Sequence, residues 1–200
     1  KIIVPAVSAH RHPESKWPSL DNDLFQKMIG EIIDCAKVSS SRENKPKKTS
    51  SGLFIGREKE KWRRLENEED VRSVAENFFS FDMLNPASLD PSDQVLSFNN
   101  ADIVFAVAGG VNPTVMFCQP GTIVIELIPP EFHGDWGMRI WCALLNLNYW
   151  RVTGKYSDHH VNLGSLPIDR DFGISLDYFR RTMDNVTENI SELYLERIYT

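Results

Sequence analysis

The chain has 200 residues, a formal net charge of -6 and 42% hydrophobic residues. This composition is enough for one good hydrophobic core with extensions, and the acidic balance excludes broad binding to nucleic acid backbones, which needs a basic surface. No apolar stretch is long enough to span a bilayer. Three cysteines, Cys35, Cys118 and Cys142, are expected to be small buried hydrophobes in a reducing compartment rather than a disulfide framework.

The first 51 residues are predicted to be an N-terminal extension, and residues 52–200 the main domain. A short strand at 1–5 precedes a Pro-, Ser- and His-rich loop, and apolar residues from Asp21 to Lys37 recur at helical spacing. The polar, basic stretch 39–51 is typical of a linker. Because the chain opens with Lys1 rather than Met, we also expect a preceding domain or anchor.

Residues 52–100 alternate between strand and helix patterns. Asn67 followed by Asp70 resembles a capping box, and Asp90 followed by Pro91 is a second helix start. The predicted elements in this part are a strand at 52–56 that ends in Arg57, a helix at 68–78, a strand at 79–84 and a helix at 90–98.

The stretch from Ala101 to Pro130 is expected to carry the chemistry. The unbroken apolar run 103–107 predicts a strand buried on both faces of a parallel sheet, and Ala108-Gly109-Gly110 removes side chains where the chain turns. Asn112, followed by Pro113, predicts a short helix over 112–117. The free N–H groups at the start of this helix should point back toward the strand end and form a site for an anion. A second apolar strand, 122–128, carries one carboxylate, Glu126.

The remaining chain continues the alternation. A helix at 133–145, a strand at 148–152 and one long or two broken helices within 174–199 are expected, while 157–173 has few signals. Strands alternating with helices predict an α/β protein with a Rossmann-like, doubly wound parallel sheet.

Several candidate binding residues follow predicted strands. An open parallel sheet binds ligands beyond the carboxyl ends of its strands, where the strand order switches, and this rule favours Arg57, Gly109, Gly110, Asn112 and Glu126. A guanidinium and a helix N-terminus suit a diphosphate, and a carboxylate suits ribose hydroxyls. We expect these groups to converge in one cleft. In the alternative interpretation the glycines only make a tight turn, Arg57 pairs with a nearby glutamate and Glu126 caps a neighbouring helix.

His133 and Asp135 are the candidate general bases, because they directly follow the second apolar strand. The alternative is that Asp135 merely suits the first turn of a helix. The chain lacks the G-x-G-x-x-G and P-loop motifs, and the spacing of its histidine pairs does not fit a helical metal site. No metal and no resident cofactor are therefore expected.

The order of these motifs resembles glycosyltransferase family 61. The resemblance covers about 52–152 and rests on Arg57 after a strand, Arg64 to Glu69, Gln94 before 101–104, and Gly109 before the run 120–129. It implies the C-terminal, donor-binding half of a GT-B architecture and sugar transfer from a nucleotide sugar without an essential metal. Enzymes of capsule and exopolysaccharide synthesis belong to this family.

One departure from the family concerns the segment after the central strand. The family typically has His-Gly-Ala-Gly-Leu-Thr-Asn there, whereas this chain has Ala108-Gly109-Gly110-Val111-Asn112-Pro113-Thr114. The resemblance therefore implies donor-binding roles for Arg57, Gly109, Glu126 and, less directly, Asn112, but no histidine from this motif.

The sequence favours a glycosyltransferase that moves a sugar from a nucleotide diphosphate to a glycan or lipid-linked acceptor. Its expected location is the cytoplasm, with peripheral association at the inner face of the membrane as a second expectation, and no nucleic acid partner is expected. A catalytically inactive, glycosyltransferase-like binding or scaffold protein is one alternative. A small-molecule-binding Rossmann-like domain unrelated to sugar transfer is another.

Overall fold

A computed structural model of the chain describes residues 22–40, 52–109, 112–130, 138–156 and 170–199, with side chains left undescribed at 22, 23, 40, 112 and 191–199. The predicted strand 1–5 lies outside the described residues, as do Gly110 and residues 131–137, which include His133, Asp135 and the first part of the predicted helix 133–145. The elements of the main sheet and its connections are α1 (Asn22–Ser40), β1 (Gly52–Ile55), α2 (Glu68–Glu76), β2 (Phe81–Met83), η1 (Pro86–Ser88), α3 (Pro91–Asn99), β3 (Ile103–Val107), η2 (Asn112–Phe117), β4 (Ile123–Ile128), α4 (Met138–Leu144) and β5 (Asn148–Thr153).

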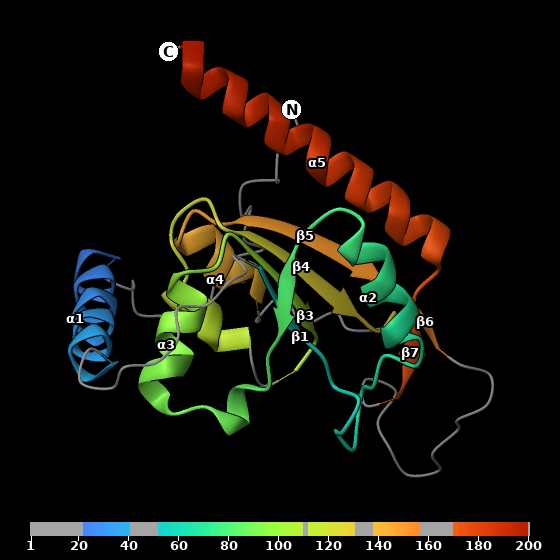
Figure 1. Cartoon of the computed structure of the whole chain (residues 1–200), viewed down its shortest axis with the longest axis horizontal. Coiled ribbons are helices and arrows are strands. Elements are labelled where there is room, and N and C mark those ends of the chain that lie inside the picture. Colours follow the sequence, from blue (N-terminus) through green and yellow to red (C-terminus); the bar gives the residue numbers. More distant parts are fainter. Residues whose placement is uncertain (1–21, 41–51, 110–111, 131–137, 157–169, 200) are drawn as a thin grey trace, which may run out of the picture.

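The five strands form one parallel sheet in the order β2-β1-β3-β4-β5 (Figure 1). The chain runs outward from β1 to β2, then crosses back so that β3 lies on the other side of β1. This order confirms the predicted α/β Rossmann-like fold and puts the reversal of strand order between β1 and β3.

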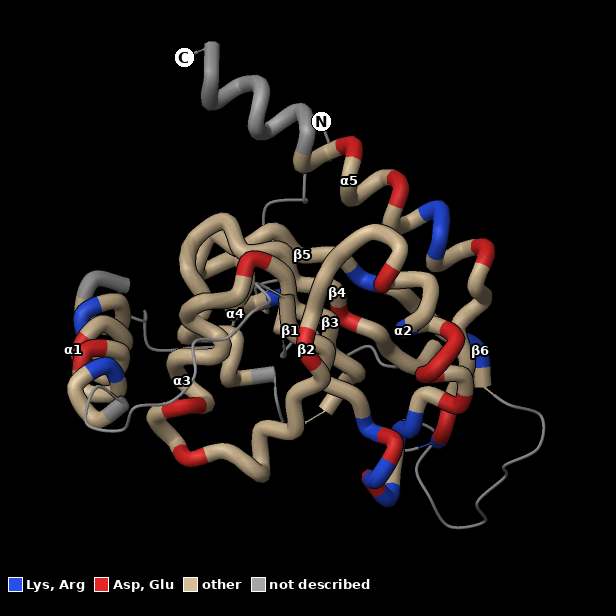
Figure 2. Tube along the Cα trace, in the orientation of Figure 1, with Lys and Arg blue, Asp and Glu red and all other residues tan. Residues whose placement is uncertain are grey.

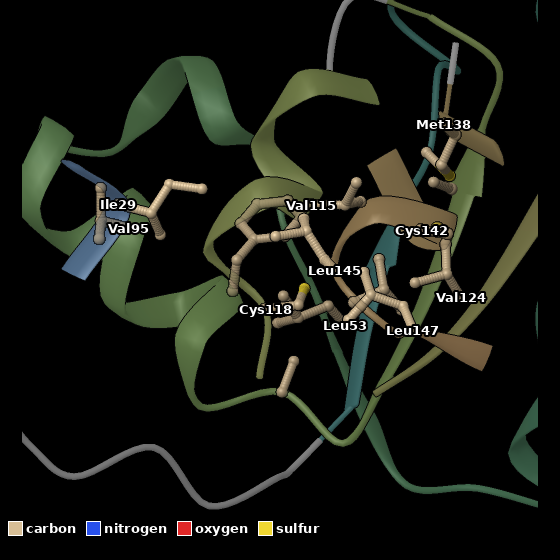
Figure 3. Packing of buried hydrophobic residues seen from close by; sticks show 14 of the residues in the cluster. Ile29, Leu53, Val95, Val115, Cys118, Val124, Met138, Cys142, Leu145 and Leu147 are labelled. Atoms are coloured by element: carbon tan, nitrogen blue, oxygen red, sulfur yellow. The ribbon is translucent and has the colours of Figure 1, made fainter. Parts of the chain in front are cut away.

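Alternate residues of each strand face two separate helical layers. On one face, Leu53, Val104 and Val124 pack with residues of α1, α3, η2 and α4. Figure 3 shows this cluster, with Ile29 of α1 beside Val95 of α3 and Cys142 of α4 near Val124. On the other face, strand residues such as Phe105 pack with α2 and with α5 (Leu176–Tyr199), the single long helix that ends the described chain (Figure 1).

Helix α1 belongs to the same core as the sheet. Its apolar face buries Phe25, Ile29, Ile33 and Ala36 in the cluster with α3, and the Phe25 ring stacks on Trp141 with centroids 5.5 Å apart. The helix therefore packs on the main body, and the division of the chain at residue 51 stays a prediction.

Two predicted helix caps begin their helices without the expected side-chain bond. Asn67 and Asp90 occupy the N-cap positions of α2 and α3, but neither side chain makes a cap hydrogen bond. The amide of Asn67 instead donates to Ile174 O at 2.8 Å and accepts from Ile174 N at 3.0 Å. For Asn67, a partner that is distant in the sequence has therefore replaced the expected local cap bond.

A second, two-stranded sheet was not predicted. It pairs β6 (Lys155–Tyr156) with β7 (Phe172–Gly173) in antiparallel fashion. Strands of two residues carry no periodic signal, because alternation needs at least four residues to be recognised. The segment 170–174 contains β7, and its backbone also pairs with the turn that precedes α2.

All three cysteines are free, as expected, but only two of them are buried. Cys118 and Cys142 lie in the core, and burial raises the pKa of the Cys118 thiol to about 12. Cys35 on α1 is exposed, contrary to the expectation of a buried thiol. Across the described residues, no helix combines the length and the apolar character needed to cross a bilayer.

Candidate functional site

The candidate site lies where β1 and β3 end. β1 stops at Ile55, which pairs with Ala106 of β3, and the chain continues through Gly56 into Arg57. β3 continues to Val107, and Ala108 donates its N–H to Leu127 O before Gly109. Both segments therefore leave the sheet side by side at the switch in strand order, the position where open α/β sheets bind ligands.

Arg57 and Gly109 are in direct contact. A Cβ atom placed on Gly109 would lie 2.0 Å from Nη1 of Arg57, so the guanidinium occupies the space that any other residue at 109 would need. The φ of Gly109 is not in the left-handed region, unlike that of Gly121. Glycine is thus required here by close approach rather than by backbone conformation.

The Arg57 side chain is held by carbonyl and carboxylate oxygens. Its Nε and Nη2 donate to Trp62 O at 3.2 and 3.0 Å, and Nη2 lies 3.9 Å from a carboxylate oxygen of Glu60. The side chain is 14% exposed, whereas that of Glu60 is 58% exposed. The alternative in which Arg57 pairs with a nearby glutamate therefore describes one of its contacts, although at a separation that gives little energy in water.

Positive charge is concentrated around Arg57. Partial burial lowers the pKa of its guanidinium, the neighbouring Arg63 lowers it further, and Glu60 opposes both. Arg63 itself has a left-handed φ of 58°, which is uncommon for a residue with a side chain. Figure 2 shows that basic and acidic residues both occur along this turn, so Arg57 and Arg63 lie among charges of both signs. Two guanidinium groups held close to each other favour an anion nearby, because each raises the energy of the other.

The turn that carries Arg57 is tied to a distant part of the chain. Arg64 N donates to the Asp171 carboxylate at 2.8 Å, while Glu66 N donates to Phe172 O and Phe172 N donates to Arg64 O. Sequence reasoning missed Asp171, because 157–173 shows few patterns and the partner lies 107 residues away.

Glu126 lies within β4 and is buried. It is the fourth residue of β4, pairs with Ala106 and Arg151, and is only 4% exposed. Its Oε2 accepts a hydrogen bond of 2.5 Å from the Tyr149 hydroxyl, whose pKa is raised by burial and by the adjacent carboxylate.

The Glu126 carboxylate lies near residues on the face of the sheet that α4 covers. The Cys142 thiol has a pKa raised first by burial and then by nearby Cys118 and Glu126. Arg57 and Gly109 thus lie in contact, and Glu126 makes a buried pair with Tyr149, while the common cleft stays a prediction. The alternative in which Glu126 caps a neighbouring helix also stays untested.

The short helix predicted over 112–117 is present as η2, with the same bounds. It is a 3-10 helix of six residues, and Asn112 is its first residue rather than the residue before it. Such a short helix has little dipole, so the predicted anion site at its N-terminus has no support in the helix itself. The roles of Gly110, His133 and Asp135 stay predictions, since these residues lie outside the described ranges.

Two surface hollows lie away from Arg57. One, of about 390 Å³, lies between α1 and α3, and the other, of about 250 Å³, lies between α1 and the segment 116–120. Neither is lined by Arg57, Gly109 or Glu126. Among the described residues, no group of three His, Cys, Asp or Glu side chains is placed to hold a metal ion.

Comparison with solved structures gives distant similarities. The chain aligns with a D-isomer specific 2-hydroxyacid dehydrogenase family protein from Klebsiella pneumoniae 342 at 8% identity and a TM-score of 0.34, covering 86% of this chain and 65% of that one. It aligns with the TT0316 protein from Thermus thermophilus at 8% identity and a TM-score of 0.32, covering 83% and 63%. The chain thus spans somewhat less than two thirds of either protein.

Sequence comparisons are more specific. No curated protein matches the chain. The family model described as Glycosyltransferase 61 matches residues 2–125, which is more than half of the chain and includes Arg57, the turn up to α2, and the segment from Ala108 to Ile125. The protein therefore belongs to the glycosyltransferase 61 family.

Proposed function

We propose that this chain binds a nucleotide-diphosphate sugar and transfers the sugar to a glycan or lipid-linked acceptor in the synthesis of a capsular or other polysaccharide. Membership of the glycosyltransferase 61 family supports the class of reaction. The observation that carries the proposal for this chain is the contact between the Arg57 guanidinium and Gly109 at the β1–β3 switch. A cation packed against bare backbone at this position suits the diphosphate of a donor.

In the proposed mechanism Arg57 stabilises the negative charge that develops on the departing diphosphate. Gly109 lets the guanidinium pack against the backbone, and Gly110 and Asn112, in the segment that follows, are proposed to lie near the phosphates. The guanidinium stays charged, because an arginine side chain does not lose its proton in proteins near neutral pH. Charge stabilisation by a fixed arginine needs no essential metal, and we propose none.

Glu126 is proposed to orient the nucleotide through its ribose hydroxyls. Its carboxylate is buried and already accepts from Tyr149, so one oxygen is held in a defined direction. A base deprotonates the acceptor hydroxyl, and His133 and Asp135 are the candidates in this chain. The proposal also includes a second half of the enzyme, which binds the acceptor. The proposed location of the enzyme is the cytoplasm, at the inner face of the membrane.

Calorimetric titration tests the proposal. UDP, GDP and their sugars carry a diphosphate, whereas CMP sugars carry a single phosphate and serve as the control ligand. We expect at least one diphosphate ligand to bind more tightly than the CMP sugar, and Arg57→Ala to weaken that binding about tenfold or more while changing the melting temperature little. Absence of binding by every diphosphate ligand would overturn the proposal.

A second candidate function is a family member that binds the donor without turning it over. Ala108 favours it, because a fully buried methyl group stands where the family typically has an imidazole. The alanine side chain has no polar atom, and the backbone N–H of this residue already donates to Leu127 O. Donor hydrolysis and transfer assays distinguish the two: binding with no release of the nucleotide supports the inactive protein.

A further inference from the structure

The backbone of Arg57 is held by a carboxylate from the next helix. Arg57 N donates to Oε2 of Glu68 at 2.9 Å, across eleven residues of sequence. Glu68 is the first residue of α2, and it is buried, with 8% of its surface exposed. A carboxylate that is removed from water is costly unless it accepts strong hydrogen bonds, so its placement against this peptide needs a reason.

Gly56 provides the space for that carboxylate. A Cβ atom on Gly56 would lie 1.9 Å from Oε1, 2.6 Å from Cδ and 2.8 Å from Oε2 of Glu68. The carboxylate therefore rests directly against the backbone at 56, and a residue with a side chain would displace it. Both its position and its bond to Arg57 N depend on this glycine.

Two bare backbone positions thus bracket Arg57. Gly56 admits the Glu68 carboxylate on one side, and Gly109 admits the Arg57 guanidinium on the other. Trp62 O holds the Nε and Nη2 atoms of the same guanidinium. The peptide and the side-chain tip of Arg57 are consequently each fixed by a separate partner, so the direction of the side chain between them is determined.

We propose that Glu68 is a positioning residue that acts through Arg57: its carboxylate fixes the Arg57 peptide so that the guanidinium lies on Gly109, at the switch point, facing the diphosphate of the donor. The inference rests on the proposed function. Glu68 itself touches no ligand in this arrangement. Its contribution is orientation, which matters because a guanidinium rotated away from the phosphates loses its hydrogen bonds to them.

A double-mutant cycle on the 200-residue chain tests the inference, with UDP, GDP and inorganic pyrophosphate as calorimetric probes. Glu68→Ala should weaken binding of the diphosphate probe about tenfold or more. Glu68→Gln keeps an oxygen that accepts from Arg57 N and should restore most of the affinity. In the double variant with Arg57→Ala, Glu68→Ala should add no further loss, because the residue through which it acts is absent.

The outcomes separate this inference from the function on which it rests. If Arg57→Ala leaves the binding of all three probes unchanged, the proposed function fails and this inference fails with it. If Arg57→Ala weakens binding but Glu68→Ala only lowers the melting temperature, or if the two losses add in the double variant, Glu68 has a structural role and the inference alone is overturned.

Gly56→Ala keeps the inference testable if Glu68→Ala does not fold. The added methyl group pushes the carboxylate off the Arg57 peptide while leaving both functional side chains in the sequence. We expect weaker binding of the diphosphate probe in a folded protein, and unchanged affinity would contradict the inference.

Discussion

The carboxylate of Asp171 accepts three hydrogen bonds from Arg64. The Arg64 backbone N–H donates to Oδ1 at 2.8 Å, and the guanidinium Nε and Nη2 donate to Oδ2 at 2.9 and 2.6 Å. Asp171 is buried, whereas the Arg64 side chain is 44% exposed. This contact, together with the bonds between Asn67 and Ile174, ties the turn that carries Arg57 to the small sheet.

Asp171→Asn should destabilise the protein by about 2 kcal/mol, because a buried acceptor of charged hydrogen bonds is replaced by a group that donates. The free energy of unfolding in urea measures the effect. Asp34→Asn is the matched control, since Asp34 pairs with Lys37 at 3.2 Å on the surface of α1 and both side chains are exposed. A change of less than about 0.5 kcal/mol is expected there. Equal effects in the two variants would contradict a special role for Asp171.

Gly109→Ala should separate binding from stability. The methyl group would meet the tip of a flexible side chain, Nη1 of Arg57, so the guanidinium moves aside at little cost to folding. We expect diphosphate affinity to fall about as much as in Arg57→Ala, with a small change in melting temperature.

Gly30→Ala is the control for that substitution. Nothing lies within 4 Å of a Cβ atom at this position in the middle of α1. Alanine should raise the stability by up to about 1 kcal/mol, since it is the better helix former, and affinity should stay unchanged. If the two variants bind diphosphate equally well, the contact between Arg57 and Gly109 has no part in binding.

Tyr149→Phe should destabilise the fold by about 1–3 kcal/mol, because the buried Glu126 carboxylate loses the hydroxyl that donates to it at 2.5 Å. Chemical denaturation measures the loss. Tyr178→Phe on α5 is the control, since this tyrosine is 39% exposed and water replaces its hydroxyl contacts. A Tyr149→Phe protein as stable as its control would show that the pair contributes nothing to folding.

Glu68 should make stability depend on pH in a defined direction. Burial raises the pKa of its carboxyl above the ordinary value of 4.5, and the hydrogen bond from Arg57 N partly opposes the shift. The folded state therefore binds the proton more tightly than the unfolded state. The resulting stability is fully present below the unfolded pKa and is lost as pH rises through the folded pKa.

The comparison with Glu68→Gln isolates this effect, because the neighbouring side chains of Glu58, Glu69 and Arg72 are present in both proteins. The unfolding free energy of the wild type minus that of Glu68→Gln should fall as pH rises above about 4.5 and then level off. Urea midpoints measured from about pH 4 to about pH 8 give the difference. A difference that stays flat or rises with pH would contradict the raised pKa.

Local patterns predicted most of the regular structure. The buried strand 103–107 and the helix after Asn67 appear as expected, because an apolar run and a helical period are properties of a few consecutive residues. The meeting of Arg57 and Gly109 was also predictable, since parallel strands bring their carboxyl ends to one edge of a sheet.

Side-chain partners were much harder to predict. Asn67 occupies the predicted cap position, yet its amide binds Ile174, and Glu126 lies in the predicted strand, yet its carboxylate binds Tyr149. Glu68 belongs to the stretch from Arg64 to Glu69 that resembles the family, but no role was predicted for it, and nothing in the sequence pairs it with the peptide of Arg57. The partner of each of these side chains depends on how neighbouring helices and strands pack against one another.

The amino-acid sequence by itself determined the alternation of strands and helices, the parallel sheet and the family, because periodicity and motif order are written along the chain. The tertiary structure alone decided which polar groups meet: Arg57 with Glu68, Arg64 with Asp171, and Glu126 with Tyr149. These contacts join residues that are up to 107 positions apart, so only the packing of the sheet and its helices brings them within hydrogen-bond distance.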